Sequence, residues 1–308
     1  MLGLTTKTTT TTKTSPTTVC GVPVGTLESV RSVTGYDLGL ITSPDRRQVT
    51  VQFDLPDVTV CDETTWQRFE QYIASIPQII AAFTVDTAGT SAPGARVGVV
   101  FRTVHADEVK DHASFLADIA VAAAAPLFAA ADATLPVESR PLTPADVCEH
   151  LTSCLRTTVT TDWSSVTSVT HQEHDDHLVV GDTEWSVFQT PVDADVLVGE
   201  VDELMGLWEG TDWLRRTRIF RPHIVADAAD DTTLAGDGRR HQIITVTGGL
   251  DADAAFINSL SSKASISLRR AWLRQAVLAV EGLGTGVLGF QNPLSTLHRP
   301  RRLRAGRY

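Results

Sequence analysis

Three histidines and three carboxylates lie close together in the segment His171-Gln-Glu-His-Asp-Asp-His177. Imidazole and carboxylate groups are the usual protein ligands of zinc and similar metals. On a helix, His171 and His174 would share one face, whereas His177 would lie about 120° away from His171. The H-E-x-x-H pattern of zinc peptidases is absent, because Glu173 stands directly before His174. A solvated polar loop that leads into a strand explains the same residues, and we favour it over a metal site.

Motifs for nucleotide binding and nucleophilic catalysis are absent from the sequence. No G-x-x-x-x-G-K-S/T segment occurs, which excludes an ATPase of the P-loop type. The segment Gly282-Leu-Gly-Thr-Gly286 follows a predicted helix, so we expect a left-handed glycine there to end that helix. No G-x-S-x-G elbow occurs, and no cysteine has the surroundings of a nucleophile. We therefore predict a protein that is not an enzyme and that binds no cofactor.

The chain is acidic except at its carboxyl end. The 308 residues have a formal net charge of -11, which disfavours nucleic acid and acidic lipid as partners of the body of the protein. Residues 298–308 reverse this sign, with no acid and five arginines: Arg299, Arg301, Arg302, Arg304 and Arg307. A basic segment of this kind can grip phosphates, lipid headgroups or an acidic protein surface. We expect this tail to contact a partner.

Cysteine usage and the start of the chain bear on location. The sequence has no C-x-x-C pair among its four cysteines, which are Cys20, Cys61, Cys148 and Cys154. This predicts reduced thiols in an intracellular protein. The start is a Thr tract without the apolar region of a signal peptide. The most apolar stretch, 119–131, falls short of the roughly 20 residues that a membrane span needs, so we expect a water-soluble protein.

The periodicity of apolar residues predicts an α+β fold. In the first half we expect a hairpin at 37–42 with 48–55, a helix at 64–80, strands at 82–86 and 95–104, and a long helix at 107–131. In the second half we expect a hairpin at 177–180 with 185–190, a helix at 195–205, and strands at 214–224 and 241–247. A helix at 251–262, a short strand at 266–268 and a helix at 269–281 follow. Hairpins interspersed with helices predict antiparallel or mixed sheets, with helices packed on one face.

The two halves share a loose plan, and a true duplication and a chance likeness both fit it. We divide the chain into a disordered Thr-rich tail (1–18), an amino-terminal lobe (19–140), a carboxyl-terminal lobe (141–290) and a basic tail (291–308). A helix starts just after residue 140. Thr143 is its predicted N-cap, Pro144 takes the first helical position, and Asp146 completes a box-like cap.

Tryptophans gather in the second half of the chain. Stacking on bases or sugars would use such residues, but the acidic surroundings disfavour a polyanion. Core and interface packing is the better interpretation. Aromatic and Arg side chains dominate protein contacts, so we predict interface anchors at Trp208, Trp213 and Arg215.

Several short segments resemble proteins encoded beside the ATPases of actinobacterial conjugative transfer and type VII secretion. They are Gly21-Val-Pro-Val-Gly25, Arg140-Pro-Leu-Thr-Pro-Ala-Asp-Val147, Trp163 with Trp185, Arg221-Pro-His223, and Arg269-Arg-Ala-Trp-Leu-Arg-Gln-Ala276 with its flanking residues. The chain is similar to the EccE-type component of type VII secretion systems and to its conjugation-associated relatives. It departs from them at its start, where a Thr tract stands in place of transmembrane helices.

The resemblance implies a non-catalytic scaffold, peripheral to the cytoplasmic face of the plasma membrane. Its partners would be a secretion ATPase or channel subunits, with acidic lipid contacted through the Arg tail. The family supplies no catalytic residues to carry over. Two alternatives from other classes stay open: a metal-dependent enzyme that uses His171, His174 and His177, and a nucleic-acid-binding accessory that uses the tail.

Overall fold

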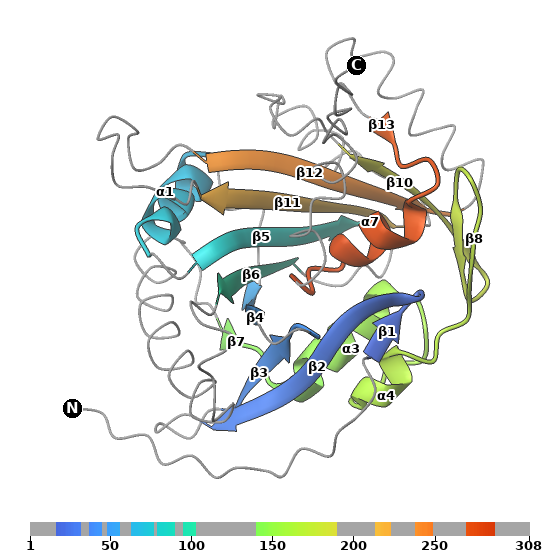
Figure 1. The fold of residues 1–308 in the computed structure, drawn as a ribbon, viewed down its shortest axis with the longest axis horizontal. Coiled ribbons are helices and arrows are strands. Elements are labelled where there is room, and N and C mark those ends of the chain that lie inside the picture. The colour runs from blue at the N-terminus through green and yellow to red at the C-terminus, as the bar shows by residue number, and fades with distance from the viewer. Residues whose placement is uncertain are drawn as a thin grey trace, which may run out of the picture.

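The computed structural model describes residues 17–31, 37–44, 48–55, 63–76, 79–89, 95–102, 140–189, 213–222, 238–248 and 269–286, and every structural statement below concerns these residues. Their strands form one antiparallel sheet (Figure 1) in the order β1-β2-β3-β4-β6-β5-β11-β12-β10-β9-β8, with β7 beside β4 and β13 beside β10. The strands of the first half are β1 (Thr17–Val19), β2 (Val22–Arg31), β3 (Asp37–Thr42), β4 (Gln48–Leu55), β5 (Ile79–Ala88) and β6 (Ala95–Arg102). Those that follow are β7 (Arg140–Pro141), β8 (His171–Glu173), β9 (Leu178–Val180), β10 (Thr183–Gln189), β11 (Leu214–Pro222), β12 (Gly238–Thr247) and β13 (Arg269–Arg270).

Four helices are described: α1 (Glu63–Ala74), α3 (Pro144–Cys154), α4 (Trp163–Val166) and α7 (Gln275–Glu281). Helix α1 contacts β5 and β11, α3 contacts β2 and β3, and α7 contacts β10, β12 and β2. The α+β class and the antiparallel sheet predicted from the sequence are thereby confirmed.

The register of the strands reveals an internal repeat. Phe53 on β4 pairs with Val97 on β6 and with Pro141 on β7. Phe188 on β10 pairs in the same way with Ile244 on β12 and with Arg270 on β13. A helix follows each short strand, α3 after β7 and α7 after β13. The halves therefore match strand for strand, β2-β3-β4-β5-β6-β7 against β8-β9-β10-β11-β12-β13.

The two copies join edge to edge at the centre of the sheet, where β5 pairs with β11. Thr84 pairs with Val97 on β6, and Arg216 pairs with Ile244 on β12, so these two residues are equivalent. Their successors, Val85 and Thr217, are equivalent too, and they pair with each other. An approximate twofold axis therefore passes through the Val85–Thr217 pair, and the strand order is symmetric about it.

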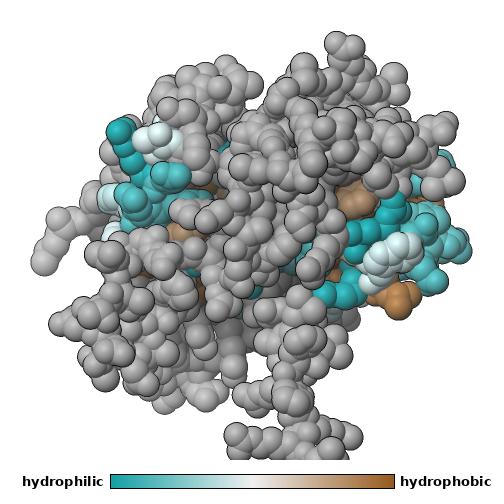
Figure 2. All heavy atoms as spheres, turned by 90° about the horizontal axis from the view of Figure 1, so that it is seen from above, coloured by the Kyte–Doolittle hydropathy of each residue, from teal (hydrophilic) through white to brown (hydrophobic). Residues whose placement is uncertain are grey.

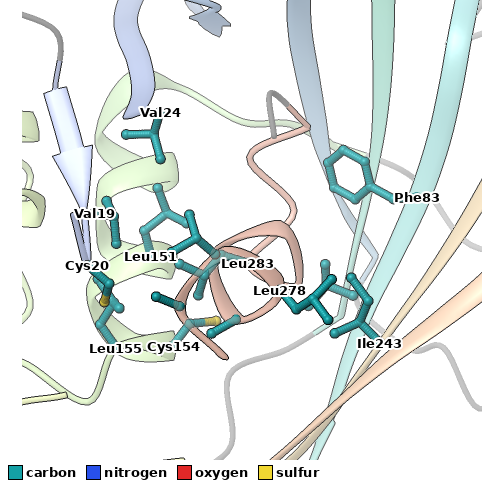
Figure 3. Close-up of a cluster of buried hydrophobic side chains, with 14 of the residues drawn as sticks. Val19, Cys20, Val24, Phe83, Leu151, Cys154, Leu155, Ile243, Leu278 and Leu283 are labelled. Carbon is teal, nitrogen blue, oxygen red and sulfur yellow. The ribbon is translucent and has the colours of Figure 1, made fainter. Parts of the chain in front are cut away.

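The copies share one hydrophobic core. Figure 3 shows Leu278 of α7 and Leu283, just after that helix, between Leu151 of α3 on one side and Phe83 and Ile243 of the central strands on the other. The same buried cluster contains apolar residues of β1 and β2 and of β9 and β10. One buried cluster thus draws on residues of both copies. The repeat also places β7 and α3 with the first copy, which differs from the predicted division after residue 140.

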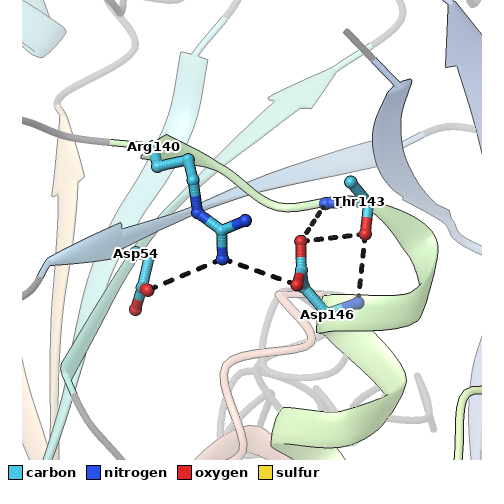
Figure 4. A network of polar contacts seen from close by, with 4 residues as sticks. All are labelled: Asp54, Arg140, Thr143 and Asp146. Atoms are coloured by element: carbon cyan, nitrogen blue, oxygen red, sulfur yellow. Dashed lines mark hydrogen bonds and ion pairs between the residues drawn. The ribbon is translucent and has the colours of Figure 1, made fainter.

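The start of α3 is held by the predicted capping box. The Thr143 hydroxyl accepts a hydrogen bond from the Asp146 backbone N–H at 3.2 Å, and the Asp146 carboxylate accepts one from the Thr143 backbone N–H at 2.9 Å. Arg140 lies between Asp146 and Asp54 of β4, at 3.4 Å and 3.9 Å (Figure 4). The box satisfies amides that the first helical turn leaves without carbonyl partners, and Arg140 ties the helix start to the sheet.

The largest local difference from the sequence prediction is at 269–281, where a continuous helix was expected. Arg269 and Arg270 instead form β13, and α7 begins only at Gln275. The two-residue strand pairs with β10 and so satisfies backbone groups that a helix would have bonded internally. The predicted helix of 64–80 ends at Ala74, and β5 begins at Ile79. The predicted helices at 107–131, 195–205 and 251–262, the strand at 266–268, and residues 1–16 and 291–308 of the terminal tails lie outside the described residues. Thr17 and Thr18, which were assigned to the disordered tail, instead begin β1 and pair with β2.

Candidate functional site

The three histidines of the predicted metal cluster lie at one end of the sheet. His171 is exposed on strand β8, while His174 and His177 flank the turn that joins β8 to β9. The rings of His174 and His177 stack, with centroids 4.3 Å apart and 12° between their planes. The Nδ1 atom of His177 lies 2.8 Å from Asp176 Oδ1.

This arrangement does not gather metal ligands. Stacked parallel rings direct their nitrogens along their own planes, so the two imidazoles do not converge on a shared point. Within the part of the chain that the structure describes, no group of three or more His, Cys, Asp or Glu side chains could hold a metal ion. His174 and His177 belong to the polar turn that leads into β9, whereas His171 lies on β8.

A second group of reactive side chains is buried in the core. Cys154 and His150 lie one turn apart on α3, with Sγ 3.4 Å from Nε2. Arg215 on β11 is 2% exposed; it donates to Thr245 Oγ1 at 3.3 Å, and its guanidinium lies 5.0 Å from the Trp185 ring centroid. Burial, with the nearby charges of Arg96 and Arg215, lowers the pKa of His150 well below its ordinary value.

This buried group is not a nucleophilic site. Burial raises the pKa of Cys154, although the Arg215 charge opposes the rise, and both Cys154 and His150 are closed to solvent. A thiol that stays protonated and out of reach neither attacks a substrate nor binds a metal. The i, i+4 spacing of His150 and Cys154 could have indicated the contact from the sequence, but not its burial.

The residues predicted as interface anchors are not on the surface where the structure describes them. Trp213 and Arg215 are both buried, and Arg215 also bonds the Ala279 carbonyl at 3.4 Å. Their predicted role is therefore corrected: Arg215 joins β11 to α7, and Trp213 is hydrogen-bonded through its backbone to Thr247. Leu214 and Arg216, the residues that follow each of them, are buried as well, so this part of the chain is covered on both faces of the sheet, which the aromatic and Arg content alone did not reveal. Trp208, Arg299, Arg301, Arg302, Arg304 and Arg307 lie outside the described residues.

The exposed apolar side chains at this end of the molecule come from the loop between β13 and α7. Trp272 is 62% exposed and Leu273 is 71% exposed; we call these two residues the exposed pair. Seen from above, the described surface is mainly hydrophilic with small hydrophobic areas (Figure 2). Exposing two adjacent large apolar side chains to water is unfavourable in free energy, so their position at the surface requires a physical explanation.

The loop that carries the exposed pair is firmly held. The Leu273 backbone N–H donates to the Asp175 carbonyl at 2.9 Å, and Trp272 N–H donates to the Arg270 carbonyl at 3.0 Å. Gln275 is fully buried; its amide accepts from Val187 N–H at 2.8 Å and donates to the Asp176 carbonyl at 2.9 Å. These bonds join the loop to the turn at 174–177 and to β10, so the exposed pair sits on a rigid base.

The exposed pair is an insertion relative to the first copy of the repeat. Leu142 N–H donates to the Gln52 carbonyl at 3.0 Å, and Ala271 N–H donates to the Val187 carbonyl at 2.9 Å, so Leu142 and Ala271 are equivalent. In the first copy the next residue is the N-cap of α3, whereas in the second copy two residues intervene before the N-cap of α7. Those two are Trp272 and Leu273.

The backbone at the exposed pair is strained. Leu273 has φ +57°, in the left-handed region that glycine occupies without penalty. A leucine there costs roughly 1–2 kcal/mol. The fold therefore carries a bulky apolar residue where glycine would be more stable, at a place where the first copy of the repeat needs no residue. This combination marks the loop as the best candidate for function among the described residues.

No protein-family model matches this chain, and no curated protein matches it. The site must therefore be interpreted from its geometry. That geometry displays apolar side chains to solvent. Among the described residues, no helix combines the length and apolar composition needed to cross a membrane.

Sequence reasoning missed this loop because it placed residues 269–281 in one helix. On a helix, Trp272 and Leu273 would have been ordinary members of a half-buried face. The signal that could have found them is the comparison of the two segments Arg140-Pro-Leu-Thr-Pro and Arg269-Arg-Ala-Trp-Leu-Arg-Gln. Both lead from a short strand into a helix, and the second is longer by the exposed pair.

Proposed function

We propose that this protein is a non-catalytic scaffold that binds a partner protein through the exposed pair, Trp272 and Leu273. The assembly it serves is an actinobacterial type VII secretion or conjugative transfer complex, and the partner is its ATPase or a channel subunit at the cytoplasmic face. The observation that carries the proposal is the insertion of two exposed apolar residues into one copy of a duplicated fold.

The exposed pair stands on a strained loop that is held by hydrogen bonds. This favours a role in partner binding over a role in stabilising the fold. Side chains that stay in water add little to the free energy of folding, whereas a buried Trp is among the residues that contribute most to protein contacts. A rigid base lowers the entropy lost when the side chains dock. The strain at Leu273 is then offset only in the bound state.

The choice of assembly is supported by the resemblance of short segments. Two of these segments, 140–147 and 269–276, occupy equivalent places in the repeat, because each leads from a short strand into a helix. The resemblance thus concerns the junction that the second copy has modified with the exposed pair. Arg140 and Asp146 show that the first junction is built for stability, since their contacts stay within the fold.

Co-purification from an actinobacterial host tests the proposal. The tagged full-length chain is compared with the variant Trp272→Ser/Leu273→Gly and with Val159→Ser, which alters another exposed apolar residue. We expect a translocation ATPase or channel subunit to co-purify with the wild type and with Val159→Ser, and to be lost from the double variant. The proposal is wrong if no transport component is retained by the wild type, or if the double variant retains it equally.

A further inference from the structure

The surface beside the exposed pair is acidic. Residues 171–184, which form β8, β9 and the start of β10, contain no Lys or Arg and five acids: Glu173, Asp175, Asp176, Asp182 and Glu184. We call this segment the acidic hairpin. Four of the five acidic residues are exposed, and the side chain of the fifth, Asp176, is 40% exposed. Their charges therefore reach the solvent.

Arg270 offsets only part of this charge: its Nη1 lies 4.0 Å from Asp176 Oδ2, and Asp176 is the least exposed of the five acids. The Arg270 side chain is only 14% exposed, and its Nη1 donates to the Asp176 carbonyl at 3.1 Å. Its guanidinium carbon lies 5.1 Å from the Phe188 ring centroid and 5.9 Å from that of Trp272. Arg274 is half-buried. The arginine thus lies behind the Trp272 ring, and among the described residues the exposed charges of the hairpin beside the pair are negative.

The exposed pair and the acidic hairpin form one rigid unit. Leu273 N–H is bonded to the Asp175 carbonyl, and the Glu173 carboxylate accepts a hydrogen bond from Ala276 N–H at 3.0 Å at the start of α7. Asp182 lies in the turn after the three-residue strand β9, which spans about 10 Å, and Glu184 on β10 pairs with Val179 of β9. A partner that contacts Trp272 therefore also meets the hairpin carboxylates.

We infer that the partner presents an apolar pocket bordered by Lys or Arg side chains, which receives the exposed pair while its basic rim faces the acidic hairpin. This inference rests on the proposed function and specifies the chemistry of its partner. Nucleic acid and acidic lipid are disfavoured as occupants, because the hairpin would repel their phosphates. Complementary charge on a protein rim instead steers association and fixes its orientation.

Site-specific photo-crosslinking tests the inference in cells. A benzophenone amino acid replaces Trp272 in the full-length chain, and the same amino acid at Val159 serves as control. We expect a protein adduct specific to position 272 whose cross-linked peptide combines apolar residues with neighbouring Lys or Arg. Adding Asp175→Lys/Glu184→Lys should reduce its yield about tenfold or more, and Glu149→Lys, an exposed charge reversal on α3, should leave it unchanged.

Each other outcome overturns the inference: an adduct with lipid, an adduct with a second copy of this chain, no adduct above the level at position 159, or an adduct indifferent to the charge reversal. The outcomes also separate the two proposals. A basic-rimmed partner that is not a transport component supports the inference and removes the proposed function. A transport component whose cross-linked peptide is acidic supports the proposed function and overturns the inference.

Discussion

Thr217 on β11 pairs with Val85 on β5, and each is the counterpart of the other in the internal repeat. The two copies are therefore joined as two protomers of a twofold dimer would be, through their edge strands. Residues away from the axis have diverged. Phe83 pairs with Gly98 in the first copy, and the equivalent pair in the second copy is Arg215 with Thr245.

The Phe83–Gly98 pair predicts a steric cost. A Cβ added at Gly98 would overlap the Phe83 ring, which is itself buried in the core. We expect Gly98→Ala to lower the free energy of unfolding by about 1–3 kcal/mol, as overpacked cores do. Urea unfolding measures the loss. Gly98→Ala/Phe83→Leu should recover part of it, and equal stability of Gly98→Ala and wild type would contradict the packing described.

The Arg216–Asp86 ion pair predicts that the effects of substituting these two residues on the free energy of unfolding are strongly coupled. Arg216 Nη2 lies 2.6 Å from Asp86 Oδ2 across β11 and β5, and the two side chains are 3% and 12% exposed. Asp86→Ala should cost about 3–5 kcal/mol, because it removes the carboxylate from a buried guanidinium. Replacing both residues, as Asp86→Ala/Arg216→Met, should restore much of this loss. Additive losses in a double-mutant cycle would show that the pair is not coupled.

The capping box predicts that the free energy of unfolding depends on pH in the acid range. Partial burial alone would raise the pKa of Asp146, but hydrogen bonds from Thr143 and the Arg140 charge outweigh it and hold that pKa below its ordinary value of 3.8. A lowered carboxyl pKa stabilises the fold above the unfolded value, and this contribution is lost as pH falls through the folded value.

The variant Asp146→Asn makes this dependence measurable. We expect it to cost about 1 kcal/mol near neutral pH, as the loss of a helix cap does. The difference between wild type and variant should shrink as urea unfolding is repeated from about pH 6 to about pH 3. A difference that stays constant over this range would mean that the ionised carboxylate does not stabilise the cap.

We expect the buried cysteines to be unreactive toward thiol reagents in the folded protein. Burial raises the pKa of Cys20 to about 12 and that of Cys148 to about 11, and it raises the pKa of Cys154 as well. In a Cys61→Ser background, a disulfide reagent at about pH 8 should modify none of these three thiols until urea is added. Rapid modification of the native protein would contradict their burial.

Much of the fold followed from the sequence because its signals were local. Alternation in 37–42 and 48–55 predicted β3 and β4, and the Thr143-Pro-Ala-Asp segment predicted the capped start of α3. The left-handed glycine expected at the end of the last helix occurs at Gly284, with φ +71°, whereas Gly282, which caps α7, is right-handed with φ -67°. These features depend on neighbours within a few residues, which is the range over which sequence patterns are informative.

The rest depended on distant partners. Arg269 and Arg270 became a strand only because β10 offers a free edge there, and that edge is formed by a segment some eighty residues earlier. Arg215 suggested a surface anchor, yet it is buried between Trp185 of β10 and Thr245 near the end of β12. The exposed pair could not be recognised from composition, because its meaning comes from its absence in the first copy.

The central claim is that Trp272 and Leu273 are retained for binding and not for folding. The most direct measurement is the free energy of unfolding of Trp272→Ser/Leu273→Gly in urea. We predict a value within about 0.5 kcal/mol of the wild type, or up to about 1 kcal/mol higher, because glycine relieves the strained backbone at position 273. A loss of about 2 kcal/mol or more would show that these side chains support the core, and would contradict the account.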